Sequence, residues 1–186
     1  MQLPPRKYLL AGAAGLIVML LASRRASAAS GRIRTMLSPA WLASNKPSAK
    51  KLANVDIIEE VFRKYGYSDT VIAAAVANAW HESTWYEKAI GDGVCSVGLF
   101  QLNACGGAGN GLSTAYRQDP YNNTRTIIER EVTKTGGRNF RKRAAAGARV
   151  GELAYLFCRD IERPKKPHEA GLKRQAMAEK MFPSLA

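Results

Sequence analysis

Cysteine and histidine are scarce in this chain, whose 186 residues include three cysteines and two histidines. No two cysteines have the C-x-x-C spacing of zinc and redox sites, so we predict neither a metal site nor a cofactor. Cys95 and Cys105 flank a short segment and could form a disulfide in an exported domain. Small buried thiols are the alternative for both residues.

Acidic residues are absent from the first fifty positions, which hold eight Lys and Arg. Residues 51–186 hold twenty basic and fifteen acidic residues, so the net charge of +13 is concentrated in the N-terminal arm. Such an arm can bind anionic lipid, nucleic acid or an anionic cell-wall polymer. It can also serve only to flank a membrane segment and to keep the chain in solution.

The main uncharged apolar run, residues 9–22, is short for a membrane span. Its fourteen residues would extend about 21 Å as a helix, whereas a bilayer core is about 30 Å thick. Arg6-Lys7 and Arg24-Arg25 flank the run, and snorkelling arginines would complete a marginal span. We predict a membrane-associated helix in residues 1–25. A signal peptide cleaved near Ala26-Ser27-Ala28 and a buried core helix are the alternatives.

Residues 26–51 are rich in Ser, Ala, Pro and Lys, which indicates a basic linker. Trp41 and Leu42 lie within it and are candidates for contact with a membrane or a partner. The globular domain is then expected to span residues 52–186.

The pattern within residues 52–186 is mainly helical. Gly66 is a natural end for a first helix, and Ser68-Asp69 begin a second that runs to Glu82. Residues 94–103 favour a short strand or hairpin, and residues 104–112 favour a loop. Asp119-Pro120 begins another helix, residues 138–143 read as a basic turn, and apolar faces near 150–161 and 172–181 predict two more helices. The fold class is therefore mainly α, with a small β-hairpin.

Glu82 is the best candidate for chemistry, because it follows an alanine-rich, apolar stretch of helix. Apolar surroundings remove water and favour the protonated form of a carboxyl group, which can then act as a general acid. The alternative is an ordinary glutamate on the surface of a helix.

Four short motifs occur in order: Glu82-Ser83, Gly98-Leu99-Phe100-Gln101, Asp119-Pro120-x-x-Asn123 and Phe157-x-x-x-x-Glu162-Arg163-Pro164. Together, over about residues 55–165, they resemble the lysozyme-like superfamily. The resemblance is strongest to the soluble lytic transglycosylases and to virus-borne wall-degrading proteins. Phe100 replaces the methionine usual in that family. The resemblance implies a lysozyme-like α+β fold with the hairpin beside an active-site cleft.

The resemblance also implies roles for individual residues. Glu82 becomes the catalytic acid, while Ser83 and Gln101 orient it or hold the sugar. Gly98 would let the backbone approach the glycan closely, and the remaining members of its segment, Leu99 and Phe100, would line the cleft. The family's Ala-Tyr-Asn motif has no clear counterpart, since Leu156 follows Tyr155, so Tyr155 is a candidate for substrate binding with a core tyrosine as the alternative.

The resemblance implies a reaction in which one glutamate serves as both acid and base. That reaction is the lytic transglycosylase cleavage of peptidoglycan between N-acetylmuramic acid and N-acetylglucosamine, and it leaves a 1,6-anhydro end. A two-carboxylate hydrolase would need a second acid. Asp92 lies between two glycines, where aspartate usually bonds the local backbone, so we favour the single-glutamate reaction.

Arginines crowd the C-terminal flank of residues 9–22, which favours retention of the domain in the cytoplasm, away from the wall. Delivery inside a virus particle would bring the domain to the wall despite this charge bias. Other particle or envelope proteins would then be its partners. A membrane-bound enzyme acting in the periplasm, a secreted or anchor-released lysozyme-type hydrolase, and a non-enzymatic scaffold with a basic arm are the alternatives.

Overall fold

A computed structural model describes residues 31–186 of the chain. The predicted anchor run, residues 9–22, and the start of the predicted linker lie outside the described residues. Within residues 31–186, no helix is both long enough and apolar enough to cross a membrane.

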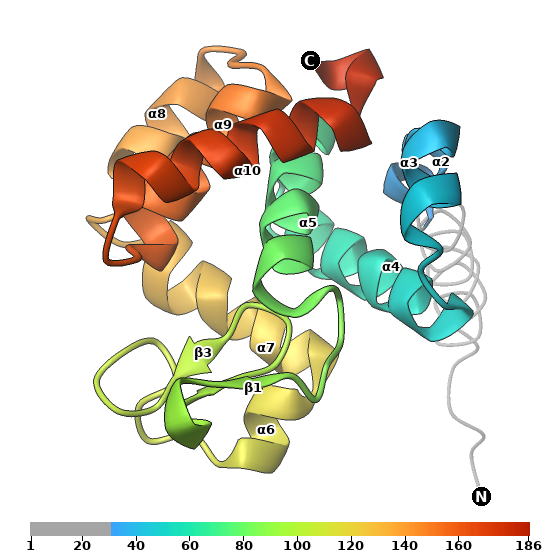
Figure 1. Ribbon diagram of the computed structural model, residues 1–186. Coiled ribbons are helices and arrows are strands. Elements are labelled where there is room, and N and C mark those ends of the chain that lie inside the picture. The colour runs from blue at the N-terminus through green and yellow to red at the C-terminus, as the bar shows by residue number, and fades with distance from the viewer. Residues whose placement is uncertain (1–30) are drawn as a thin grey trace, which may run out of the picture. The chain divides into compact units, whose positions relative to one another are not determined.

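The described residues are mainly helical, with one small antiparallel sheet (Figure 1). The predicted fold class is therefore confirmed for this part of the chain. Its helices are α2 Arg32–Thr35, α3 Pro39–Asn45, α4 Ala49–Lys64, α5 Asp69–Ser83, α6 Thr114–Gln118, α7 Pro120–Ile127, α8 Arg138–Ala145, α9 Val150–Leu156 and α10 Pro167–Met181. Short helical turns are η2 Asp92–Val94, η3 Ile128–Val132, η4 Phe157–Glu162 and η5 Pro183–Leu185. The predicted basic turn at residues 138–143 proves to be helical, because Phe140 packs into the core.

Two of the three strands of the sheet lie within residues 94–103, where the sequence predicts a strand or hairpin, and the first strand precedes that region. Strands β1 Ile90–Gly91, β2 Ser96–Val97 and β3 Leu102–Asn103 pair antiparallel in that order. Ile90 pairs with Val97, and Ser96 pairs with Asn103. The loops between these strands carry the Gly98–Gln101 segment.

Helix α5 forms the centre of the domain. Every residue from Val71 to Ala79 is buried, because alanines dominate the helix and let neighbouring elements approach closely. Helices α4, α9 and α10 pack against it. Figure 1 shows α8, α9 and α10 on one side of α5 and the sheet with α6 on the other. The C-terminal end of α5 therefore lies where these two sides meet.

The helix ends abruptly at this place. Thr84 adopts a left-handed conformation with φ +51°, and its backbone N–H donates to the carbonyl of Trp80 at 2.7 Å. Glu82 consequently lies in the last turn of α5, in the position that the sequence predicts.

Residues 31–51 differ from the predicted linker, because they fold onto the domain as α2, α3 and the start of α4. Ile33 and Leu37 are buried in the core. The carboxylate of Glu59, itself buried, accepts hydrogen bonds from the backbone N–H groups of Gly31 at 3.1 Å and Ile33 at 2.9 Å. The folded unit that the structure describes therefore includes residues 31–51 and does not begin near residue 52.

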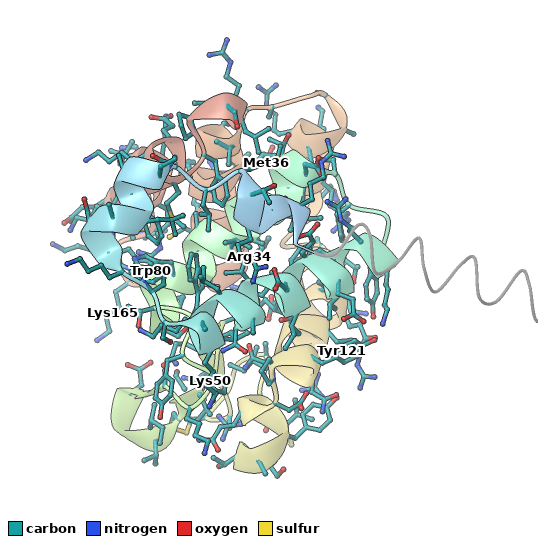
Figure 2. All side chains as sticks on the ribbon, turned by 90° about the vertical axis from the view of Figure 1, so that its right-hand side faces the viewer. Arg34, Met36, Lys50, Trp80, Tyr121 and Lys165 are labelled. Carbon is teal, nitrogen blue, oxygen red and sulfur yellow. A yellow bond between two sulfur atoms is a disulfide. The ribbon has the colours of Figure 1, made fainter. Side chains whose placement is uncertain are left out.

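An aromatic cluster secures α3 to the end of α5. The ring of Trp41 lies 4.8 Å from that of Trp80 and 5.5 Å from that of Trp85, in edge-on and tilted arrangements. Such contacts stabilise a domain beyond the area that they bury. Figure 2 looks onto this face and labels Trp80 beside α3. Trp41, expected as a candidate contact with a membrane or a partner, is partly buried and packs against the core.

The inclusion of α2 in the folded domain can be tested with two Ile→Ala changes. Ile33→Ala should lower the free energy of unfolding by about 3 kcal/mol, because it leaves a cavity in the core. Ile90→Ala is the matched control, since its side chain is 57% exposed, and it should cost at most about 0.5 kcal/mol. Urea unfolding of both variants measures the difference. Equal costs would mean that α2 does not belong to the folded domain.

Candidate functional site

A cleft of about 540 Å³ opens beside the C-terminal end of α5. Its wall contains four carboxylates, Glu82, Asp92, Glu131 and Glu162, and two basic residues, Arg163 and Lys165. The side chain of Glu82 is 22% exposed, so it is partly withdrawn from water and still reachable. Among the residues predicted for the site, Glu82, Phe100 and Gln101 line this cleft together.

Phe100 and Gln101 contribute differently to the wall. Phe100 is almost fully buried and packs against Phe62 and Phe157, so it supports the cleft more than it faces it. Gln101 has a left-handed backbone with φ +44°. Its amide nitrogen donates to the carbonyls of Gly98 at 2.9 Å and Ala89 at 3.3 Å, which fixes the side chain against the loop.

Ser83 and Leu99, both predicted to bind substrate, do not line the cleft. Ser83 Oγ lies 2.9 Å from the carbonyl oxygen of Ala79 and 3.0 Å from that of Leu99. Leu99 itself is fully buried. The serine therefore holds the last turn of α5 against the Gly98–Gln101 segment, which sets the distance between Glu82 and the opposite wall.

Gly98 also has a structural reason to be glycine. Its φ is +87°, and a Cβ at this position would collide with the carbonyl oxygen of Arg117 and the side-chain amide of Asn123. The space beside Gly98 is thus filled by the protein, and a close approach of glycan is not needed to explain the residue.

Asn123 is the buried partner that organises this segment. Its Oδ1 accepts from the backbone N–H of Phe100 at 2.9 Å, and its Nδ2 donates to the carbonyls of Val97 at 3.1 Å and Arg117 at 2.6 Å. All three bonds are internal, so Asn123 supports the cleft from behind. Asp119 begins the same helix, α7, by accepting from the backbone N–H of Asn122 at 2.8 Å.

Tyr155, the last residue predicted to bind substrate, lies on α9 and is not among the residues that line the cleft. Its hydroxyl is 2.8 Å from Nδ1 of His168, and its ring packs where Gly171 of α10 leaves room. These contacts tie α9 to α10.

Two charged residues that interact with Glu82 or with its partner were not predicted as site residues from the sequence. Arg174 on α10, whose side chain is 5% exposed, forms a charge-assisted hydrogen bond to Oε1 of Glu82. Its Nη2 also lies 3.6 Å from Oε2 of Glu162, whose side chain is 8% exposed. Glu162 belongs to the Glu-Arg-Pro element of the sequence, but no sequence signal marks Arg174, which lies 92 residues from Glu82.

Burial controls the electrostatics of this cluster. Desolvation raises the pKa of Glu162 well above its ordinary value, the negative charge of Glu82 raises it further, and Arg174 lowers it. Burial together with Glu162 raises the pKa of the neighbouring Cys158 thiol to about 12. On the other side of Arg174, burial and then the arginine charge lower the pKa of His81. The protein thus favours a neutral Glu162 next to an Arg174–Glu82 ion pair.

Asp92 lies on the opposite wall, where a disulfide restrains the loop. Its Oδ2 accepts from Ser96 Oγ at 3.0 Å, which in turn accepts from Asn103 Nδ2 at 3.2 Å. Cys95 and Cys105 form the disulfide that was one of the two expected states. The Asp92 carboxylate bonds the side chain of Ser96 rather than the local backbone that the sequence predicts, and it faces the same cleft as Glu82.

Comparison with known proteins identifies the class. The family model for phage tail lysozymes matches residues 53–185, so the chain belongs to this family. The protein is accordingly a lysozyme-like phage protein of a peptidoglycan-degrading family. No curated protein and no solved structure matched the chain.

The structural role of Gly98 can be tested against a second glycine with a similar backbone. Gly66 has φ +78°, and nothing lies within 4 Å of the position of a Cβ there. Gly66→Ala should therefore cost about 1 kcal/mol from backbone strain alone. Gly98→Ala should cost at least about 3 kcal/mol, because it adds a collision with buried Asn123. Thermal and urea unfolding measure both values, and similar costs would contradict the packing role.

Proposed function

We propose that the protein is a peptidoglycan lytic transglycosylase that cleaves the β-1,4 bond between N-acetylmuramic acid and N-acetylglucosamine. The observation that carries the proposal is the position of Glu82, a partly buried carboxyl group on the wall of a cleft at the end of an apolar helix. Membership of the phage tail lysozyme family supports the substrate class.

In the proposed reaction, Glu82 acts first as acid and then as base. Its carboxyl proton passes to the glycosidic oxygen, and the bond from that oxygen to C1 of the muramic acid breaks with its electron pair. The C6 hydroxyl oxygen of the same sugar then bonds to C1, while its proton returns to the Glu82 carboxylate. No water is consumed, and the product carries a 1,6-anhydro ring.

A lysozyme-type hydrolase is the second candidate, and the place of Asp92 in the cleft favours it. In that reaction a carboxylate on the far wall would activate water or stabilise the positively charged sugar. The hydrogen bond from Ser96 keeps Asp92 in a fixed orientation, which suits either a structural or a catalytic use. The chemical nature of the new chain end separates the two reactions.

The setting of the reaction is also a proposal. The family supports a phage-associated protein that acts on the cell wall. We infer that the protein is carried in the virus particle and that residues 1–25 attach it to a membrane, while the basic arm contacts anionic lipid or wall polymer. A non-enzymatic scaffold with the same fold is the alternative to activity.

Glu82→Gln tests the function on purified peptidoglycan. The variant keeps the shape of the side chain but cannot supply the proton, so release of soluble muropeptides should fall by about 100-fold or more. Glu60→Gln is the control, because Glu60 forms an exposed ion pair with Lys64 on α4. Mass spectrometry of the wild-type products should show anhydro ends.

Three results would count against the proposal. A wild-type protein that releases nothing, or a Glu82→Gln variant that releases as much as wild type, would remove the enzymatic function. Reducing ends in the products would replace the transglycosylase with a hydrolase.

A further inference from the structure

Glu162 is a buried carboxyl group that the proposed reaction does not use. It lies at the end of η4 and forms part of the cleft wall. The groups that face it are Glu82 from α5, Arg174 from α10 and Cys158 from η4. The next titratable or charged groups are His81, whose pKa burial, Arg174 and Lys173 lower, and Arg163, which bonds Glu131 at 2.7 Å.

Within the part of the chain that the structure describes, neither oxygen of Glu162 accepts a hydrogen bond from an N–H or O–H donor, and the neighbouring Cys158 thiol is only a weak donor. Arg174 stays 3.6 Å away, because its guanidinium already bonds Glu82. Buried carboxylates normally have donors, since an unsatisfied buried charge is costly. A protonated Glu162 resolves this, because a neutral carboxyl group can donate to an acceptor, and the acceptor beside it is Glu82.

Glu59 shows how this protein satisfies a buried carboxylate that has only a structural role. It is fully buried and accepts from the backbone of Gly31 and Ile33 and from Nε and Nη2 of Arg63, at 2.7–3.1 Å. Glu162 is buried to a similar degree and has none of these bonds. The difference indicates that Glu162 is held for its proton rather than for a structural ion pair.

The charges of the cluster also favour a protonated carboxyl group at this place. With both glutamates ionised, a buried site would hold two negative charges against the single positive charge of Arg174. One proton shared between the carboxyl groups makes the cluster neutral, which is the arrangement expected for two adjacent carboxylates.

We propose that Glu162 is a positioning residue for Glu82: the two carboxyl groups share one proton, and Glu162 passes it to Glu82 for the cleavage step. This inference rests on the proposed function of Glu82. A general acid must be protonated before it acts, yet the Glu82 carboxyl group is bonded to Arg174. A proton from Glu162 would supply what Glu82 needs.

The transfer conserves atoms and charge. The O–H bond of Glu162 breaks, its electron pair stays on the Glu162 oxygen, and the proton bonds to an oxygen of Glu82. Arg174 then neutralises Glu162 instead of Glu82 by closing the 3.6 Å gap to Oε2. When Glu82 later accepts the proton of the sugar C6 hydroxyl, the pair again holds one proton, so the cluster returns to its starting charge.

Glu162→Gln is the first test, measured as the pH profile of peptidoglycan cleavage. The amide keeps the shape of the side chain but removes the shared proton, so Glu82 would lose its proton source while its ion pair with Arg174 remains. The high-pH limb of kcat/KM should move to lower pH by about one unit or more. Near neutral pH, kcat should fall at least about 10-fold with little change in KM, and acidic buffer should restore most of the loss.

Glu152→Gln is the matched control, because Glu152 forms an exposed ion pair with Arg143 on the outside of the domain. Its pH profile should coincide with that of wild type. A Glu162→Gln profile that is reduced equally at every pH, or whose high-pH limb does not move, would overturn the proposal, because a residue needed only for packing would behave in that way.

A second measurement needs no turnover and no Glu162 variant. Carbon-13 NMR of the side-chain carboxyl groups should show that Glu162 in the wild-type protein keeps its proton into the neutral range. In Glu82→Gln, the Glu162 transition should move to lower pH, because the neighbouring negative charge is gone. A Glu162 signal that titrates as in an ordinary glutamate, or is indifferent to Glu82→Gln, would overturn proton sharing.

These readouts separate the inference from the function on which it rests. If Glu82→Gln cleaves peptidoglycan as well as wild type does, the proposed function fails and the NMR titration still decides whether the carboxyl groups share a proton. If Glu82→Gln is inactive but the Glu162 signal titrates ordinarily, the function stands and the proton-sharing role of Glu162 fails.

Discussion

The burial of α5 is the constraint on which the rest of the domain depends. From Val71 to Ala79 the helix has no exposed side, so the remaining elements must pack around it. Its alanines allow this close packing, and its one buried amide, Asn78, donates to the carbonyls of Ala74 and Ala154, which joins α5 to α9. A helix enclosed in this way can present a functional group only near its ends, and Glu82 lies in its last turn.

The same packing brings together charges that are far apart in the chain. Arg174 reaches Glu82 from α10, and Glu162 reaches both from η4, because the small side chains of α5 let these elements approach. Both η3 and η4 are π-helical turns, and each carries a carboxylate of the cleft wall, Glu131 and Glu162. Such turns are frequent at functional sites, where the widened backbone redirects a side chain. The fold and the electrostatics of the cleft therefore have a common origin.

Local signals in the sequence predicted much of the fold. Gly66, with its left-handed backbone, and Ser68-Asp69 separate α4 from α5, although the Ser68 side chain makes no capping hydrogen bond. Asp119-Pro120 begins α7, because the Asp119 side chain accepts from the backbone N–H of Asn122. Residues 31–51 were misread as a linker because their order comes from distant partners: Ile33 needs Glu59 and the core, and α3 needs the tryptophans of α5 and its following turn. No local pattern reports such contacts.

The candidate site, too, could be predicted only in part from local sequence signals. Glu82 could be predicted from the apolar helix that precedes it and from the Glu82-Ser83 motif, and Gln101 could be predicted from the Gly98–Gln101 segment. The internal roles of Ser83 and Gly98 could not, since they depend on Leu99 and on Asn123 across the loop. Arg174 and the burial of Glu162 depend on how α10 and η4 pack on α5, which a short motif does not encode.

In the proposed reaction, Glu82 meets the glycosidic bond that is cleaved. A crystal structure of the Glu82→Gln variant with a bound peptidoglycan fragment would locate that bond. We predict that the glycosidic oxygen between N-acetylmuramic acid and N-acetylglucosamine lies about 3 Å from the substituted amide side chain, within hydrogen-bond reach. A fragment bound in the cleft with that oxygen beside Asp92 or Glu131, and with the substituted side chain out of reach, would contradict the account.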